Sequence, residues 1–216
     1  MGVIDPAGRA RAAIVLLWVW LLADAAFTAS QALLIWVVSD ADRLAAGNDP
    51  DGWPVLADSI AGVTGLAMIA VFIVTIVMVA RWTYRVSANA HARSDAMTIS
   101  PGWAVGWYFV PFANLIKPFE AMREIWQASF SPDDPEAEPV PGLLRAWWGL
   151  WLASSIAGNL SFQISMRMQT VEGLELSAWI DIATFVFDVP LVLVLTRLIA
   201  RLSAQQAHLN DADVFE

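Results

Sequence analysis

Four long apolar runs dominate the pattern of hydrophobic and polar positions along the chain. They cover residues 12–38, 55–80, 144–166 and 176–199, and polar stretches separate them. A helix needs roughly 20 apolar residues to cross the hydrocarbon layer of a bilayer, and each run reaches that length. The pattern therefore predicts an all-α membrane protein with four transmembrane helices in one membrane domain, residues 1–202, followed by a loose polar C-terminal tail, residues 203–216.

A fifth apolar stretch, residues 102–116, differs from the other four because prolines interrupt it. Pro101 and Pro118 bound the stretch and Pro111 splits it. As a helix it is about 22 Å long, which is short for a crossing. We expect a proline-broken re-entrant or interfacial segment here.

Two polar residues of this segment are candidates for function. In a continuous helix Pro111 and Pro118 would each free a backbone carbonyl, and the Asn114 amide is the nearest donor for such groups. Lys117 can place its charge at the membrane interface. A broken helix that lines a ligand or ion site is one reading, and a structural hairpin that packs the bundle is the plainer one.

The residues that follow predict an amphipathic helix. Phe119, Met122, Ile125 and Trp126 share one face, and the opposite face is charged. We expect this helix to lie on the cytoplasmic membrane surface, so that the re-entrant and interfacial element covers residues 102–129. Docking of a partner on the same face is the alternative.

Positive charges decide the topology, because Lys and Arg collect on the cytoplasmic side of membrane proteins. If residues 102–116 do not cross, ten positive residues lie inside and only Arg43 and Arg167 lie outside. If the stretch crosses, the split is six against six. We therefore expect four crossings with both termini in the cytoplasm. A cleavable signal peptide ending near Asp24 is a rival reading, but the apolar run continues well past it.

Composition excludes several classes of function. The chain has 58% hydrophobic and 15% charged residues, twelve Trp, no Cys and a net charge of −9, with acidic loops at residues 40–51 and 133–138. No basic surface is available for nucleic acid, and thiolate metal sites and disulfides are excluded. Both histidines lie in polar stretches, so we expect no haem, no bound metal and no other cofactor.

Three aspartates within the apolar runs form the second candidate site. Asp24, Asp181 and Asp188 would be costly in lipid unless they are paired or hydrated, so they suggest a proton or cation site. Asp181 and Asp188 share a helix face, and Pro190 frees a carbonyl beside Asp188. Alternatively, Asp24 and Asp181 are shallow enough to reach water, and Asp188 pairs with an arginine, Asn159 or Gln163.

Small residues spaced by four indicate helix packing in two of the runs. They are Ala57, Ala61 and Gly65 in one run, and Gly149, Ala153 and Ala157 in another. We expect these small residues to pack helices of one chain against each other. The alternative is that they form the contact between two chains of a dimer.

The region around the proline-rich stretch resembles a known family. Residues 81–89 and 100–126, with Pro111, Asn114, Lys117-Pro118 and Glu124-Ile125-Trp126, are similar to the bacterial membrane family called domain of unknown function 4328 (DUF 4328). The resemblance is strongest over residues 81–130. It implies a small multipass protein of the bacterial plasma membrane and implies no activity.

We find no enzyme motif, so a non-enzymatic protein is expected. The first hypothesis is a membrane scaffold that binds a protein partner in the bilayer. The alternative is a small proton- or cation-coupled transporter that uses Asp188 and Asp181 with Asn114.

Overall fold

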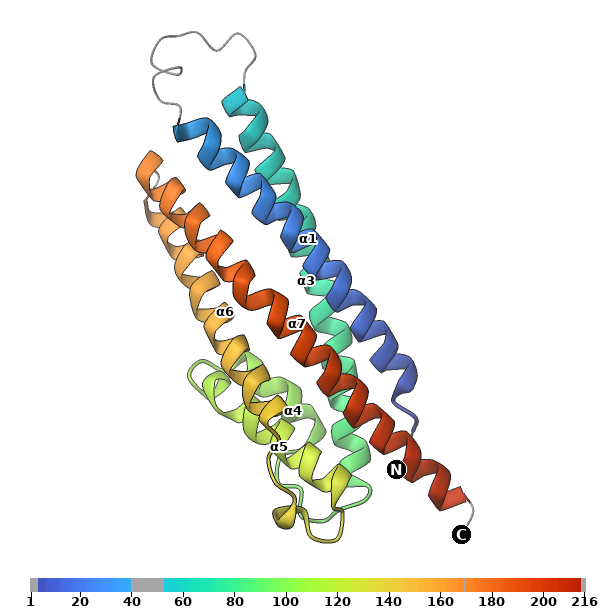
Figure 1. Cartoon of the computed structure of the whole chain (residues 1–216). Coiled ribbons are helices and arrows are strands. Elements are labelled where there is room, and N and C mark those ends of the chain that lie inside the picture. Colours follow the sequence, from blue (N-terminus) through green and yellow to red (C-terminus); the bar gives the residue numbers. More distant parts are fainter. Residues whose placement is uncertain (1–3, 40–52, 169, 215–216) are drawn as a thin grey trace. The chain divides into compact units, whose positions relative to one another are not determined.

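The computed structural model describes residues 4–39, 53–168 and 170–214, and within them every regular element is a helix (Figure 1). The long helices are α1 (Ala7–Ser39), α3 (Trp53–His91), α6 (Gly142–Arg167) and α7 (Val171–Val214). Between α3 and α6 lie α4 (Pro101–Gly106), η1 (Trp107–Phe109), η2 (Ala113–Leu115), α5 (Lys117–Phe130) and η3 (Pro135–Ala137). The predicted all-α class is confirmed. The acidic stretch 40–51, with Arg43, lies outside the described residues.

Three helices of the described part are long and apolar enough to cross a membrane. They are α1 over Ala7–Val37, α3 over Val55–His91 and α7 over Glu172–Leu209. The fourth predicted crossing, residues 144–166, is present as helix α6. Its four serines, together with Asn159 and Gln163, leave it without a window as apolar as those of the other three helices. The crossing of the membrane by α6 therefore stays a prediction.

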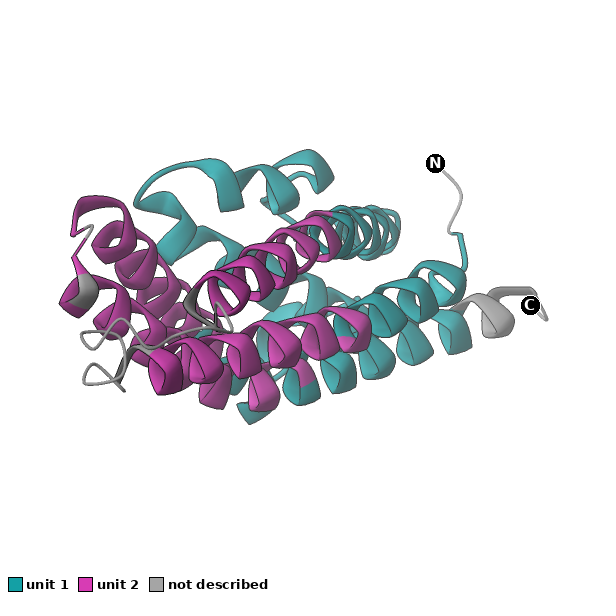
Figure 2. Cartoon of the chain, turned by 90° about the horizontal axis from the view of Figure 1, so that it is seen from above, with its two compact units in different colours: residues 1–17, 74–149, 193–216 teal, residues 18–73, 150–192 magenta. Residues whose placement is uncertain are grey.

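The chain divides into two compact units, which Figure 2 colours separately. Unit 1 contains residues 1–17, 74–149 and 193–216, and unit 2 contains residues 18–73 and 150–192. Every long helix contributes to both units. The C-terminal end of α3 and the N-terminal end of α6 both belong to unit 1, as does the whole segment that joins them.

A polar network lies at the centre of unit 1. Gln206, which is 1% exposed, donates from Nε2 to the Val86 carbonyl (3.0 Å) and to Ser129 Oγ (2.8 Å). Its Oε1 accepts a hydrogen bond from Asn89 Nδ2 (3.0 Å), and Asn89 also pairs with the backbone N–H and carbonyl of Ile4. Both amide groups thus use all their donors, which makes burial of these polar side chains tolerable.

The expectation of a loose C-terminal tail over residues 203–216 is wrong for its first part, because residues of this network belong to it. Helix α7 continues to Val214, and Ser203 and Gln206 are buried within unit 1. Trp82 Nε1 donates to Ser203 Oγ over 2.9 Å, so the polar end of α7 is joined to α3. Hydropathy falls after residue 199, but the helix continues because its polar side chains find partners inside the protein.

The helix predicted after the proline-rich stretch exists as α5, and most of its apolar face is buried by protein. Met122, Ile125 and Trp126 are at most 5% exposed, because they pack inside unit 1, whereas Phe119 is half-buried. The placement of α5 on the cytoplasmic membrane surface stays a prediction. An apolar helix face can be buried either in the protein core or in the membrane. The amphipathic sequence pattern is the same in both cases, so it does not show which of the two occurs.

Unit 2 presents an apolar exterior. Leu22, Val63 and Leu66, each at least 68% exposed, lie on α1 and α3, and Phe162 and Val186 are similarly exposed on α6 and α7. Such an extended apolar surface is typical of a protein surrounded by lipid. Within the unit, Ser30 of α1 and Thr64 of α3 are hydrogen-bonded (2.9 Å).

Gly65 of α3 allows α1 to approach closely, since a Cβ at this position would lie 3.3 Å from the Phe27 ring. The small residues around Gly65 therefore pack against a helix of the same chain, as predicted. At Gly149 a Cβ would meet open space, so this glycine is not needed for a close helix contact in the described residues.

Candidate functional site

Helix α1 carries a polar face inside unit 2. Trp20, Asp24, Thr28 and Gln31 are spaced by four, four and three residues, so they lie above one another on one side of the helix. Asp24 is only 8% exposed, and Trp20 and Gln31 are each 9% exposed. Asp24 is therefore enclosed by protein, and its depth in the membrane stays a prediction.

Helix α7 supplies the other two carboxylates. Asp188 is 4% exposed and accepts a hydrogen bond from Ser154 Oγ of α6 (2.6 Å). Asp181 is half-buried and accepts from Gln31 Nε2 of α1 (2.9 Å). Both lie within electrostatic range of Asp24. The structure thus brings the three predicted aspartates together and joins them to α1 and α6.

The partner of Asp188 differs from the expected ones. No arginine among the described residues pairs with it, and Asn159 and Gln163 hydrogen-bond to each other (2.6 Å). They lie four residues apart on α6 and satisfy each other locally. Ser154, which sequence reasoning did not select, provides the donor instead.

Several polar atoms around Asp24 have no partner in the described part of the chain. They are Asp24 Oδ2, Trp20 Nε1 and Thr28 Oγ1, and all three atoms are fully buried. Buried polar atoms are normally satisfied by protein or by ordered water. Two donors and one acceptor on a single helix face are suited to bind water molecules beside the carboxylate.

The cluster has no cationic partner among the described residues, because none of the three aspartates forms an ion pair there. In the same part of the chain no group of three or more His, Cys, Asp or Glu side chains has a geometry that could hold a metal ion. A buried carboxylate without a cation must be neutralised in another way. Binding of a proton meets that need with the hydroxyl and amide groups present.

The two candidates from the proline-rich stretch lie in a different unit from the three aspartates. Asn114 and Lys117 belong to unit 1, and the aspartates belong to unit 2. Lys117 forms an ion pair with Glu120 over 2.6 Å, and the Asn114 side chain has no hydrogen bond within the described residues. A site that combines Asn114 with the aspartates stays a prediction.

The prolines also act differently from the expectation. Pro118 lies in the first turn of α5, where no intrahelical donor is needed, so it displaces no carbonyl. Pro111 lies in the turn between η1 and η2, where the Val110 N–H still donates to the Trp107 carbonyl (3.4 Å). Pro190 lies inside α7, as predicted.

The turn at Pro111 presents an apolar tip. Phe112 has a φ of 63°, a conformation rare for a non-glycine residue, and its side chain is 85% exposed. Phe109 and Ile116 are also exposed, at 72% and 59%. An aromatic tip of this kind is unfavourable in water and favourable within a bilayer.

Comparison with known proteins agrees with the resemblance noted above. No curated protein and no solved structure matches the chain. A family model does match: its description is domain of unknown function (DUF4328), and it covers residues 49–204. That range includes α6, the proline-rich segment and α7 as far as residue 204. The chain therefore belongs to the DUF4328 family.

Proposed function

We propose that this protein is a small proton-coupled membrane transporter whose buried carboxylates in unit 2 bind and release the proton. The observation that carries the proposal is the cluster of Asp24, Asp181 and Asp188, which lies among hydroxyl and amide groups and has no cationic partner in the described part of the chain. Ionisable groups at such depth are costly and are typical of proton relays in transporters.

A proton fits this cluster better than a divalent metal. A hard cation such as Ca²⁺ or Mg²⁺ takes at least six oxygen ligands, several of them carboxylates close together. Here Ser154 and Gln31 each occupy a different carboxylate. Protonation of Asp188 would leave Ser154 hydrogen-bonded, because a hydroxyl both donates and accepts.

The proposal includes four crossings, with α6 as the fourth. Its 26 residues extend about 39 Å, and Ser154 and Ser161 turn its polar side toward the interior of unit 2. We place unit 1 on the cytoplasmic side of a bacterial plasma membrane, with both chain ends there. The distribution of charge supports this side, because ten of the twelve Lys and Arg residues belong to unit 1.

The proline-broken segment is proposed to re-enter the bilayer without crossing it. Two observations support this: α3 ends and α6 begins in the same unit, and the tip around Phe112 is apolar and exposed. In this proposal the tip dips into the cytoplasmic leaflet while α5 packs on the protein.

A partner-binding scaffold is the second candidate. It draws support from unit 1, where Arg123 and Arg145 are exposed and form no ion pairs in the described residues. Both candidates are non-enzymatic. Purification in mild detergent with a stoichiometric second protein would favour the scaffold, and recovery of the chain alone would count against it.

Two measurements test the transporter. Infrared difference spectra between acid and alkaline buffer report the protonated carboxyl group, whatever the substrate. We expect a carboxyl band that Asp188→Asn removes and the matched control Asp58→Asn, on the exposed start of α3, leaves unchanged. In proteoliposomes with a pH-sensitive dye, Asp188→Asn should reduce proton flux at least tenfold. A wild type without a titrating carboxyl band would refute the proposal.

A further inference from the structure

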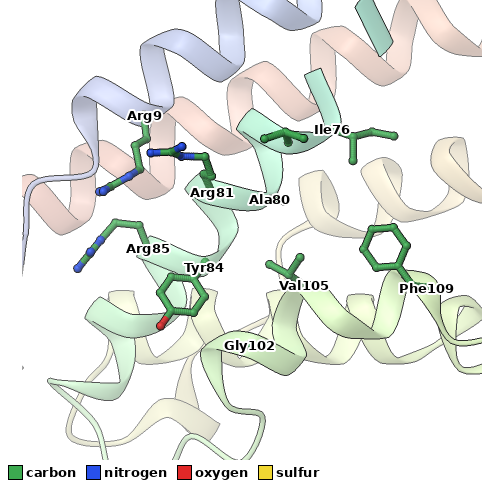
Figure 3. Close-up of a pocket in the computed structure, with 10 residues that line it drawn as sticks. Arg9, Ile76, Ala80, Arg81, Tyr84, Arg85, Gly102, Val105 and Phe109 are labelled. Atoms are coloured by element: carbon green, nitrogen blue, oxygen red, sulfur yellow. The ribbon is translucent and has the colours of Figure 1, made fainter. Parts of the chain in front are cut away.

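Unit 1 contains a groove of about 550 Å³ that is separate from the carboxylate cluster of unit 2. Helix α1 contributes Arg9, helix α3 contributes residues 76–85, and the α4–η1 segment contributes Gly102, Val105 and Phe109. Three segments distant in sequence thus form its walls. Figure 3 shows that the groove has two chemically different ends.

One end is strongly basic. The guanidinium groups of Arg9, Arg81 and Arg85 gather there, with Tyr84 beside them (Figure 3). None of the three arginines forms an ion pair or hydrogen bond within the described residues, and the Nε atom of Arg85 is buried without a partner. Three cations held together without a counter-ion repel one another, so this end is complementary to an anion.

The other end is apolar. Ile76, Val105 and Phe109 line it, and Val77 and Phe109 are 50% and 72% exposed. Ile76 and Val77 belong to the apolar part of α3, so this wall continues into the surface that would face lipid. A water-soluble anion would gain nothing from such a wall.

We propose that this groove binds one anionic phospholipid of the cytoplasmic leaflet. The phosphate lies among Arg9, Arg81 and Arg85, and the start of an acyl chain lies along Ile76, Val105 and Phe109. Arginine pairs with phosphate through two parallel hydrogen bonds, which makes the three arginines that line this groove suitable ligands for a phosphate headgroup. Basic pockets at the cytoplasmic ends of membrane helices are suited to anionic headgroups for this reason.

The test uses the full chain in nanodiscs that contain equal amounts of phosphatidylglycerol and phosphatidylcholine. After gentle transfer to detergent, native mass spectrometry counts the lipids that remain bound. The groove variant is Arg9→Gln, Arg81→Gln and Arg85→Gln combined. The matched control removes the same charge from exposed arginines of unit 1 outside the groove, through Arg11→Gln, Arg123→Gln and Arg145→Gln.

We expect the wild type to retain one phosphatidylglycerol per chain in preference to phosphatidylcholine. The groove variant should lose roughly tenfold or more of this retention, since it removes all three arginines that would hold the headgroup, and the control should lose less than about twofold. If the groove variant does not fold, Val105→Trp, which fills the apolar end, should also lower retention.

Three outcomes would overturn the proposal. Equal loss in the groove variant and the control would show general surface attraction. Full retention in a folded groove variant would show that lipid binds elsewhere. Displacement of the lipid by inorganic phosphate as readily as by short-chain phosphatidylglycerol would show a site for a free anion.

Discussion

Replacing Gln206 with Leu should destabilise unit 1, because its amide joins α7 to α3 and α5. The change keeps a similar side-chain volume but removes three buried hydrogen bonds, to Val86, Ser129 and Asn89. The largest single cost is the Asn89 N–H that loses its acceptor, because Asn89 is only 1% exposed and water cannot replace the amide oxygen.

The magnitude follows from these contacts. A buried donor without a partner costs about 1–3 kcal/mol, and each lost ordinary hydrogen bond costs about 0.5–1.5 kcal/mol. We therefore expect Gln206→Leu to lower the free energy of unfolding by about 3 kcal/mol, or roughly a hundredfold in the unfolding equilibrium. Gln205→Leu is the matched control: its side chain is half-buried and has no hydrogen bond in the described residues, so a change within about 0.5 kcal/mol is expected.

The assay is reversible unfolding by SDS in mixed micelles, followed by circular dichroism of the helices. Combining Gln206→Leu with Asn89→Leu removes the unpaired donor, so the double variant should lose less than the sum of the two single losses. A loss below about 1 kcal/mol for Gln206→Leu, or a loss equal to that of Gln205→Leu, would refute the reasoning.

Three further substitutions test other contacts. Trp82→Phe removes the buried hydrogen bond to Ser203 and should cost about 1 kcal/mol in the same unfolding assay; an unchanged midpoint would contradict it. Gly65→Leu places a side chain against Phe27 and should cost about 1–3 kcal/mol, whereas Gly62→Leu, which meets open space, should be nearly neutral. Glu124→Leu removes both carboxylate oxygens that accept hydrogen bonds from residues 98–99, so their amide hydrogens should exchange faster, and unchanged exchange would contradict this role.

The sequence predicts the helices better than their ends or partners. The apolar runs locate α1, α3, α6 and α7, because a continuous hydrophobic run is a strong local signal. Hydropathy does not show that α3 continues to His91 and α7 to Val214, since these ends are held by polar groups that meet only in the folded chain. The sequence likewise does not show that the apolar face of α5 packs inside unit 1, because its partners meet it only in the folded chain.

Some residues of the candidate site could be predicted from the sequence and others could not. The aspartates could be selected from sequence because a carboxylate in an apolar run is conspicuous. Ser154 could not, since serine is common in membrane helices and its role depends on the approach of α6 to α7. The spacing of Trp20, Asp24, Thr28 and Gln31 was a usable signal for the polar face of α1. The arginine groove combines segments near residues 9, 81 and 105, which no local pattern connects.

Single-cysteine labelling tests the central claim most directly, because the chain contains no cysteine of its own. Cysteines are placed at Asp58 and Glu172 in unit 2 and at Arg123 and His208 in unit 1, all of them exposed positions. A membrane-impermeant maleimide added to intact cells should label the cysteines at Asp58 and Glu172, and should label those at Arg123 and His208 only after permeabilisation. Labelling at Glu172 only after permeabilisation would contradict the crossing by α6, and labelling at His208 from outside would contradict the cytoplasmic placement of unit 1.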